Sequence, residues 1–301
     1  SSRSMGNETL CTLGGFCGLS TVLGAGEVRL DEHTHAYSTF ARGGVHKEQT
    51  YVLKVENANG EVMMEWQNTE GTQVLDPQIA YLVSDMLSDD AARSGTFGLG
   101  NANLVVPGLT HAVKTGTTDL SVDGWMMGYT TCTAAGVWVG NHDSKPMNSI
   151  TSQQTGPIWT SFMARAHEIR GCGTDQFAQP DGIKTVTLDS FTGRIASSNS
   201  RKTHTDIFPS WYEPAAEGST QQVTIDSVSQ RLATNCTPPR AVQQVLEAGV
   251  LPELPDSDPA FADWAKSAPY GVGGGNSTLK DNVHKCSDKA PRITNLAASP
   301  L

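Results

Sequence analysis

The sequence predicts an α+β protein in which helices flank an antiparallel sheet and a small β region follows. Three features carry this prediction. Residues 112–118, 125–129 and 134–139 have the pattern of strands, and the turns between them are short enough for an antiparallel meander. Segments before and after these strands carry apolar residues at helical spacing. Beyond Cys172, strand-like segments replace the helical pattern.

Length and composition limit the class of protein. The chain has 301 residues, of which 38% are hydrophobic, so it can bury a core and form about two domains. Its formal net charge of −10 argues against nucleic acid as a partner, which would require a basic face. No segment reaches the roughly twenty apolar residues of a membrane span. Because Ser1–Asn7 does not resemble a signal peptide, we expect a fragment of a longer protein.

The sequence predicts no metal site. Its six cysteines are scattered without a Cys-x-x-Cys pair, which argues against zinc. An even count permits disulfides in an oxidising compartment, but their pairing stays open. His33 and His35 fall within a predicted helix, where residues two apart point about 200° away from each other. These two histidines therefore cannot chelate one ion together.

The N-terminal part begins with a Gly-rich turn at residues 18–28. A helix is expected over 30–42, ended by Gly43-Gly44. Residues 50–56 and 62–67 alternate on either side of an Asn-Gly turn, a pattern that predicts a β-hairpin.

A second helix should begin at Asp76-Pro77, a cap followed by a proline in the first turn. Its buried stripe would comprise Ile79, Ala80, Val83, Met86 and Leu87. We expect residues 88–93 to end this helix and a Gly/Asn-rich loop over 95–108 to lead into the sheet. Asp89 and Asp90 could form a catalytic carboxylate pair, but adjacent side chains rarely converge, which favours a solvated helix end.

A further helix is expected from Gly156-Pro157, packing on the sheet and closing the domain near Gly171. Its apolar positions at helical spacing are Ile158, Trp159, Phe162, Met163, Ala166 and Ile169.

The β-rich region contains a duplicated pattern. Residues 186–197 (VTLDSFTGRIAS) and 223–234 (VTIDSVSQRLAT) each suggest strand, turn, strand, so we predict two β-hairpins. Asp189 and Asp226 at matching places could bind calcium, but too few carboxylates converge for that ion, and capping of the turn is favoured.

These patterns divide the chain into three parts. Residues 1–171 form the α+β part, 172–240 the duplicated hairpins, and 241–301 a Pro/Gly-rich tail that includes the linker-like stretch 270–277.

The chemistry centres on His111-Ala112-Val113-Lys114-Thr115-Gly116-Thr117-Thr118. Glycine weakens a strand unless another backbone or a ligand comes close, and the lysine and threonines supply a cation and donors beside it. The segments DGWMMGYT, AAGVWVGNHD and GPIWTSFM follow, and GLSTVLGAGEVRLDEHTHAYSTFARGGV and VLDPQIAYLVSDMLSDDAARSGTFG precede it. Over about residues 15–171 the sequence resembles the transpeptidase domain of class A penicillin-binding proteins, which share Lys-Thr-Gly with serine β-lactamases.

The resemblance implies the penicillin-binding protein/serine β-lactamase fold, incomplete at its N-terminus, and a D,D-transpeptidase reaction without a cofactor. A serine would attack the penultimate D-Ala carbonyl of a peptidoglycan stem peptide, and β-lactams would trap that serine. Lys114 would supply positive charge and a proton path. Thr115 and Thr117 would bind the substrate carboxylate with Thr118 beside them, Gly116 would admit the ligand, and the Thr117 N–H would complete the oxyanion hole.

The sequence departs from the family at one point. Ser-x-x-Lys and Ser-x-Asn should precede Lys-Thr-Gly, and neither lies before His111. The matches at 277–280 and 197–199 come after it, and we interpret both as chance. The nucleophile is therefore expected upstream of this sequence, together with any membrane anchor and glycosyltransferase domain, and the isolated chain should be inactive.

Three functions compete. The first is part of a bifunctional peptidoglycan synthase on the outer face of the bacterial cytoplasmic membrane, with other cell-wall synthesis proteins as candidate partners. The second is a serine β-lactamase or D,D-carboxypeptidase relative, and the third a non-catalytic wall-binding protein on a decayed transpeptidase fold. The extended resemblance favours the first.

Overall fold

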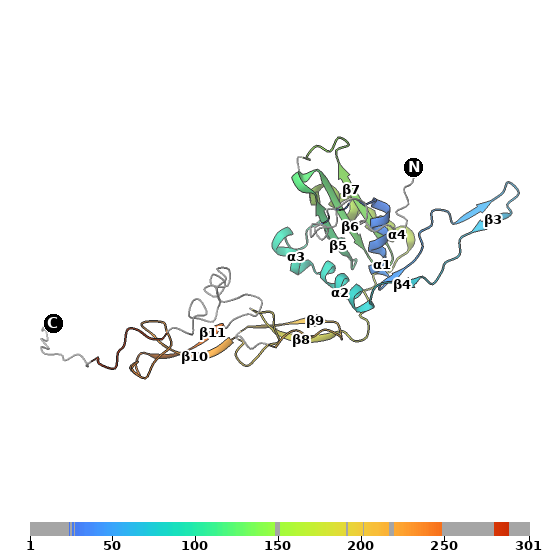
Figure 1. The fold of residues 1–301 in the computed structure, drawn as a ribbon. Coiled ribbons are helices and arrows are strands. Elements are labelled where there is room, and N and C mark those ends of the chain that lie inside the picture. The colour runs from blue at the N-terminus through green and yellow to red at the C-terminus, as the bar shows by residue number, and fades with distance from the viewer. Residues whose placement is uncertain are drawn as a thin grey trace. The chain divides into compact units, whose positions relative to one another are not determined.

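A computed structural model describes residues 24, 26, 28–147, 151–190, 192–200, 202–216, 220–248 and 280–288. The chain divides into two compact units, Ser1–Ile183 and Lys184–Leu301, which we call the sheet unit and the hairpin unit (Figure 1). The linker-like stretch 270–277 lies outside the described residues, and so does most of the Gly-rich turn predicted at 18–28.

A three-stranded antiparallel sheet lies at the centre of the sheet unit. Its strands are β5 (Ala112–Thr117), β6 (Asp123–Tyr129) and β7 (Ala134–Gly140). They lie side by side in chain order, and a short 3-10 helix, η2 (Asp119–Ser121), turns the chain from β5 into β6. This confirms the antiparallel meander that the short turns predicted.

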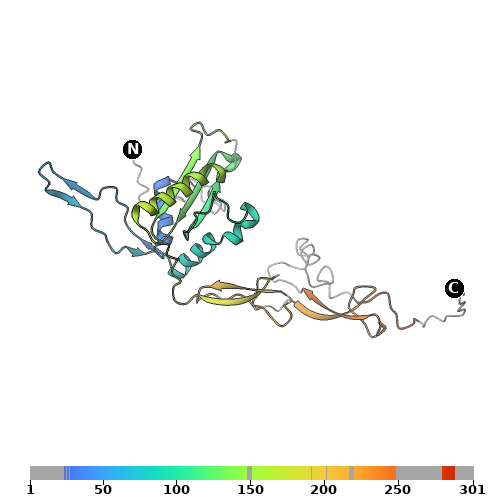
Figure 2. The ribbon, with the colours of Figure 1, turned by 180° about the vertical axis from the view of Figure 1, so that it is seen from behind.

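Helices cover both faces of this sheet. The described helices of the unit are α1 (Leu30–Ala41), α2 (Pro77–Ser88), α3 (Asp90–Phe97) and α4 (Thr151–Arg170). The two opposite views place α1 on one face of the sheet and α4 on the other (Figures 1 and 2). Glycines allow both close approaches: a Cβ on Gly128 would collide with Trp159 of α4, and one on Gly136 would collide with Thr34 of α1.

The core forms between the sheet and α4. Its buried members are Leu104, Val106, Val113, Met126, Ala135, Trp159 and Met163. The expected apolar face of α4 is only partly buried, because Ile158, Phe162 and Ile169 are exposed. The helix also begins earlier than expected, at Thr151, so that Pro157 lies inside it. The sequence prediction wrongly placed the first turn of this helix at Pro157, because proline lacks the N–H donor that a helix interior needs.

Two aspartates open the helices that precede the sheet. Asp76 Oδ1 accepts a hydrogen bond from the Gln78 N–H at 2.7 Å, which confirms the predicted cap. Asp89 caps α3 in the same way, accepting from the Ala92 N–H at 2.9 Å. The prediction that residues 88–93 only end a helix was wrong, because an aspartate before a helical stretch is also a starting signal. Met86, expected in the buried stripe of α2, is exposed.

The segment before α2 carries the predicted hairpin. Strands β2 (Lys54–Glu56) and β3 (Val62–Glu65) pair antiparallel and are exposed throughout. Both are shorter than the predicted strands at 50–56 and 62–67. A second antiparallel pair, β1 (Val45–His46) and β4 (Thr72–Gln73), joins the two ends of the segment that contains this hairpin.

The hairpin unit contains two antiparallel pairs. Strand β8 (Lys184–Asp189) pairs with β9 (Thr203–Phe208), and β10 (Thr220–Asp226) pairs with β11 (Val242–Ala248). Each repeat was expected to hold both strands of its hairpin. Instead the second half of each repeat pairs with the first through a single β-bridge, Leu188 to Ile195 and Ile225 to Leu232. The full partner strand follows later in the chain.

The boundary expected at residue 241 is also wrong for the described residues. All seven residues of β11 pair with β10, so the second hairpin continues to Ala248. Residues 280–288 attach to the same hairpin through a disulfide between Cys236 and Cys286. A second disulfide, Cys132–Cys172, lies in the sheet unit. Neither pairing could be deduced from the sequence.

Candidate active site

The Lys-Thr-Gly segment lies on β5, which pairs with β6 at the edge of the described sheet. Lys114 and Thr117 are exposed, and Thr115 and Gly116 are half-buried. Lys114 Nζ donates a hydrogen bond to the Thr115 carbonyl at 2.7 Å. Among the described residues no carboxylate pairs with this ammonium. The Lys114 ammonium is therefore a cation without a carboxylate partner among these residues.

The hydrogen-bond pattern fixes which backbone groups point outward from this edge. The Thr118 N–H donates to the Asp123 carbonyl at 3.1 Å, and residues in an antiparallel pair alternate between bonded and non-bonded positions. Counting back along the register, Gly116 and Lys114 direct their backbone groups to β6. Thr115 and Thr117 direct theirs away from it. The Lys114 contact to the Thr115 carbonyl is on that outward side.

The side chains of β5 alternate between the two faces of the sheet. Val113 belongs to the core on α4, so Thr115 and Thr117 lie on the same face as Val113. Lys114 and Gly116 lie on the face of α1. The edge thus offers a cation on one face and two hydroxyls on the other, with outward backbone groups between them.

Gly116 serves a packing need as well. It lies opposite Trp125 in the register, and a Cβ at position 116 would come 3.2 Å from the Trp125 Cβ. The Trp125 ring contacts His33 of α1, with ring centroids 6.0 Å apart, and burial lowers the pKa of His33. This neutral aromatic pair supports the strand behind Lys114.

Thr118 has a structural role in the turn that follows. Its hydroxyl donates to Asp123 Oδ2 at 3.0 Å and accepts from the Asp123 N–H at 2.7 Å. The other carboxylate oxygen of Asp123 accepts from Trp138 Nε1 at 3.0 Å. These bonds hold the end of β5 against β6 and β7. Substrate binding by Thr118 stays a prediction.

The remaining sequence candidates are kept apart by the fold. His35 faces His46, with their Nε2 atoms 3.2 Å apart, while His33 faces Trp125. Asp89 caps α3, and Asp90 pairs with Arg93 at 3.1 Å.

Of the two late motif matches, the one at residues 197–199 falls in irregular backbone. The Asn199 N–H donates to Ser197 Oγ, which makes residues 197–199 a local turn. Of the match at 277–280, the structure describes Lys280, which forms a bridge with Leu232.

One grouping was missed by sequence reasoning. Asp226, Asp281 and His284 come together in the hairpin unit. The only signal in the sequence was Asp281 and His284 at a spacing of three, and it gave no link to Asp226.

Comparison with known proteins identifies the class. Residues 30–164 match the family model described as the penicillin binding protein transpeptidase domain. Penicillin-binding protein 2D of Bacillus subtilis (strain 168) is 32% identical over 202 residues, which cover 65% of this chain and 28% of that protein. Penicillin-binding protein 1A of Clostridium botulinum (strain Langeland) is 29% identical over 161 residues, covering 53% of this chain and 18% of that protein.

A solved structure supports the same fold. The crystal structure of penicillin-binding protein 1A from Haemophilus influenzae superposes with a TM-score of 0.55 at 20% identity, covering 66% of this chain and 34% of that one. Residues 30–164 thus match the penicillin-binding protein transpeptidase domain, and the α+β fold prediction is confirmed. It spans less than a third of the length of the two curated relatives. None of the described helices is both long and apolar enough to cross a bilayer.

Proposed function

We propose that this chain is the C-terminal part of the D,D-transpeptidase domain of a class A peptidoglycan synthase. The serine of that domain attacks the penultimate D-Ala carbonyl of a stem peptide and expels the terminal D-Ala. The resulting acyl-serine passes its acyl group to an amine of a neighbouring strand, or to water, and frees the serine. β-Lactams acylate the same serine. The hairpin unit is an extension that follows this domain.

The geometry of β5 is the observation that carries the proposal. An acyl-transfer site needs hydrogen-bond donors directed at the developing oxyanion and a cation near the substrate carboxylate. The backbone N–H of Thr117, directed away from β6, would donate to the oxyanion, and the exposed ammonium of Lys114 would lie near the carboxylate. The hydroxyls of Thr115 and Thr117 would orient the substrate carboxylate, and a substrate backbone can extend along an edge strand as an added strand.

The nucleophile is proposed to lie upstream of Ser1 in the full-length protein. No Ser-x-x-Lys or Ser-x-Asn precedes Lys114, and the matched relatives are much longer than this chain. A membrane anchor and a glycosyltransferase domain would share that upstream part. The 301-residue chain would then supply one wall of the site and have no acylation activity of its own.

The two disulfides among the described residues agree with a location outside the cytoplasm. Cys132–Cys172 and Cys236–Cys286 would persist in an oxidising compartment, as expected for a protein on the outer face of the cytoplasmic membrane.

Labelling with a fluorescent penicillin tests this function. The full-length protein should be labelled at one serine, and the 301-residue chain should not. Lys114→Ala in the full-length protein should slow acylation by about 10²- to 10³-fold, the usual loss when a group that stabilises the transition state is removed. Lys145→Ala is the matched control, because Lys145 is also an exposed lysine of the sheet unit, and it should be labelled at the normal rate.

Two outcomes would overturn the proposal. One is covalent labelling of the 301-residue chain by itself. The other is full-length protein that folds, as judged by circular dichroism, yet is either unlabelled or labelled equally fast with and without Lys114. Failure to label would favour the non-catalytic wall-binding alternative.

A further inference from the structure

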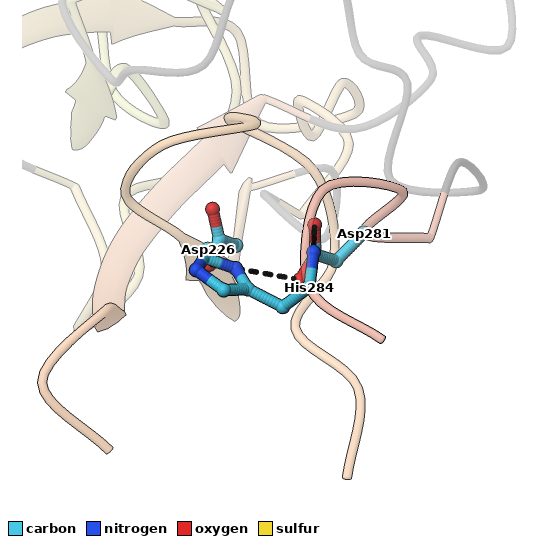
Figure 3. A group of neighbouring side chains, drawn as sticks. All are labelled: Asp226, Asp281 and His284. Carbon is cyan, nitrogen blue, oxygen red and sulfur yellow. Dashed lines mark hydrogen bonds and ion pairs between the residues drawn. The ribbon is translucent and has the colours of Figure 1, made fainter. Parts of the chain in front are cut away.

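Three side chains with metal-ligand chemistry converge in the hairpin unit (Figure 3). Asp226 ends β10, and Asp281 and His284 belong to the segment 280–288. His284 Nδ1 lies 2.7 Å from Asp226 Oδ2 and 3.2 Å from Asp281 Oδ2. One ligand atom of each residue lies within 4.8 Å of the other two. The three groups therefore face a common point.

The fold holds these residues in place from several sides. The Asp281 N–H donates to the Leu232 carbonyl at 2.8 Å, next to the bridge between Leu232 and Lys280. Thr237 Oγ1 donates to Asp281 Oδ2 at 2.8 Å. The Cys236–Cys286 disulfide ties the same two segments covalently. The cluster is thus a product of the tertiary structure, because its members come from two distant parts of the chain.

Asp226 has an oxygen for which the described residues provide no hydrogen bond. Its Oδ1 caps the turn, accepting from the Val228 and Ser229 N–H groups at 2.8 and 2.6 Å. Its Oδ2 is buried, has no hydrogen-bond partner among the described residues, and points at His284. A buried carboxylate oxygen left in this way costs free energy, so a ligand at this point would be stabilising.

The negative charges of the two buried carboxylates also favour a bound cation. The side chains of Asp226 and Asp281 have no exposed surface. Each carboxylate accepts hydrogen bonds that favour its charged form: Asp226 from two backbone N–H groups, and Asp281 from a backbone N–H and from Thr237 Oγ1. Two buried negative charges thus sit beside one imidazole. A single proton on Nδ1 can be donated to only one of the two carboxylates at a time, which leaves the other carboxylate without that donor.

We propose that Asp226, Asp281 and His284 form a binding site for a divalent transition-metal ion, with Zn²⁺ the ion that fits best. Zinc accepts imidazole nitrogen and carboxylate oxygen at about 2.0–2.2 Å, which puts tetrahedral ligand atoms roughly 3.3 Å apart. The two separations from His284 Nδ1, 2.7 and 3.2 Å, differ from this value by about 0.6 and 0.1 Å. Ca²⁺ and Mg²⁺ favour six or more oxygen ligands, which this set does not supply.

The site would be open to solvent at one position. Three protein ligands leave a fourth for water, and the His284 side chain retains 22% of its exposure, so the ion has a path inward. The bound metal would join the segment 280–288 to the second hairpin, as the disulfide does. This site is independent of the transpeptidase proposal, because no residue of β5 takes part in it.

The first repeat provides an internal control. Asp189 occupies the place of Asp226, is equally buried, and caps its turn by accepting from the Thr192 N–H at 2.9 Å. The bridge of Ile195 with Ala216 matches that of Leu232 with Lys280. Thr220 follows Ala216 at the same spacing at which His284 follows Lys280, so the first repeat lacks the nitrogen ligand.

The test is zinc binding to the chain after treatment with a chelator, measured by competition against a chromophoric zinc indicator with the disulfides kept oxidised. One zinc ion per chain is expected. His284→Ala and Asp226→Asn should each weaken binding by more than about 100-fold, since loss of even an outer-shell partner costs 10- to 100-fold. Asp189→Asn and His204→Ala are the matched controls in the first hairpin, and both should bind zinc normally.

Spectroscopy on the unmodified chain keeps the test decisive if a variant does not fold. X-ray absorption at the zinc edge should show nitrogen and oxygen neighbours at about 2.0–2.1 Å and none of the sulfur neighbours at about 2.3 Å that cysteine binding would give. Absence of stoichiometric zinc, a zinc–sulfur distance, or equal affinity in folded His284→Ala would overturn the site. Tighter binding of Ca²⁺ than of Zn²⁺ would overturn the assignment of the ion.

Discussion

The sheet unit and the hairpin unit bury different kinds of side chain. In the sheet unit, Trp159 and Met163 of α4 are fully buried against β5, β6 and β7. In the hairpin unit, the fully buried side chains include the carboxylates Asp189 and Asp226, each capping a turn. The first unit therefore depends more on the hydrophobic effect and close packing, and the second more on local hydrogen bonds, while each contains a disulfide.

The largest expected difference in stability between the two units follows from removing the side chain of Trp159, which is fully buried in the core of the sheet unit. Trp159→Ala should destabilise the sheet unit by about 3–5 kcal/mol, because it leaves a cavity and removes the donor to the Ala135 carbonyl at 3.1 Å. Hydrogen exchange measured by mass spectrometry should show lost protection in β5, β6 and β7 and unchanged protection in β8 to β11.

Ile158→Ala is the control for this change, because Ile158 is the neighbouring residue of α4 and is exposed. It should leave exchange in both units nearly unaltered. Equal loss of protection in the hairpins after Trp159→Ala would contradict the separation of the two units.

Predictability from sequence follows the same division. Residues 112–118 were recognised as a strand because alternation and short turns are local signals, and Asp76 was recognised as a cap for the same reason. Asp89 was misinterpreted because one aspartate can follow one helix and open the next. The start of α4 was missed because Pro157, which most often occupies a first turn, lies inside the helix.

The hairpin unit was harder to predict because its pairings are long-range. The two repeats were visible, but β9 and β11 lie outside them, and nothing local in the sequence specified those partners. The Asp226–His284 contact depends on the attachment of residues 280–288, which in turn depends on a disulfide that the sequence left open. For the active site, Lys114 and Thr117 were found from the motif, whereas the outward direction of the Thr117 backbone required the register.

A smaller effect concerns the covalent cross-link of the hairpin unit. Cys236→Ser with Cys286→Ser should destabilise the attachment of residues 280–288 by about 2–4 kcal/mol, as expected for a loop of this length, where the two cysteines are separated by 50 residues. Limited proteolysis should then cleave within 280–288 at lower protease concentration, with the sheet unit unchanged.

The corresponding change in the sheet unit sharpens the contrast. Cys132 and Cys172 are separated by 40 residues, so chain entropy alone predicts a similar loss. Residues near this disulfide are also held by α4, however, since the Cys172 N–H donates to the His167 carbonyl at 3.1 Å. Cys132→Ser with Cys172→Ser should therefore leave the cleavage pattern of the sheet unit intact. Release of residues 172–183 as readily as 280–288 would argue against this difference.

The smallest effect is a difference in pH dependence between the units. His167 of α4 is buried, and its Nε2 lies 2.7 Å from Thr130 Oγ1. Burial, with a contribution from Arg170, lowers its pKa in the folded state, so the unfolded chain binds a proton first as the pH falls. The stability due to neutral His167 is present above about pH 6.5, the ordinary histidine value, and is lost progressively below it.

The carboxylates of the hairpin unit respond at lower pH. Because the folded-state pKa values of Asp226 and Asp281 lie below the ordinary aspartate value of about 3.9, their stabilisation persists down to that value and is lost only as the pH falls further. Between pH 6.5 and 4.5, protection factors, which correct for the slower intrinsic exchange at lower pH, should therefore fall in α4 and the β6–β7 turn before they fall in β10. His167→Gln should abolish this early response. Simultaneous loss of protection in both units, or an early response that survives His167→Gln, would show that another group titrates.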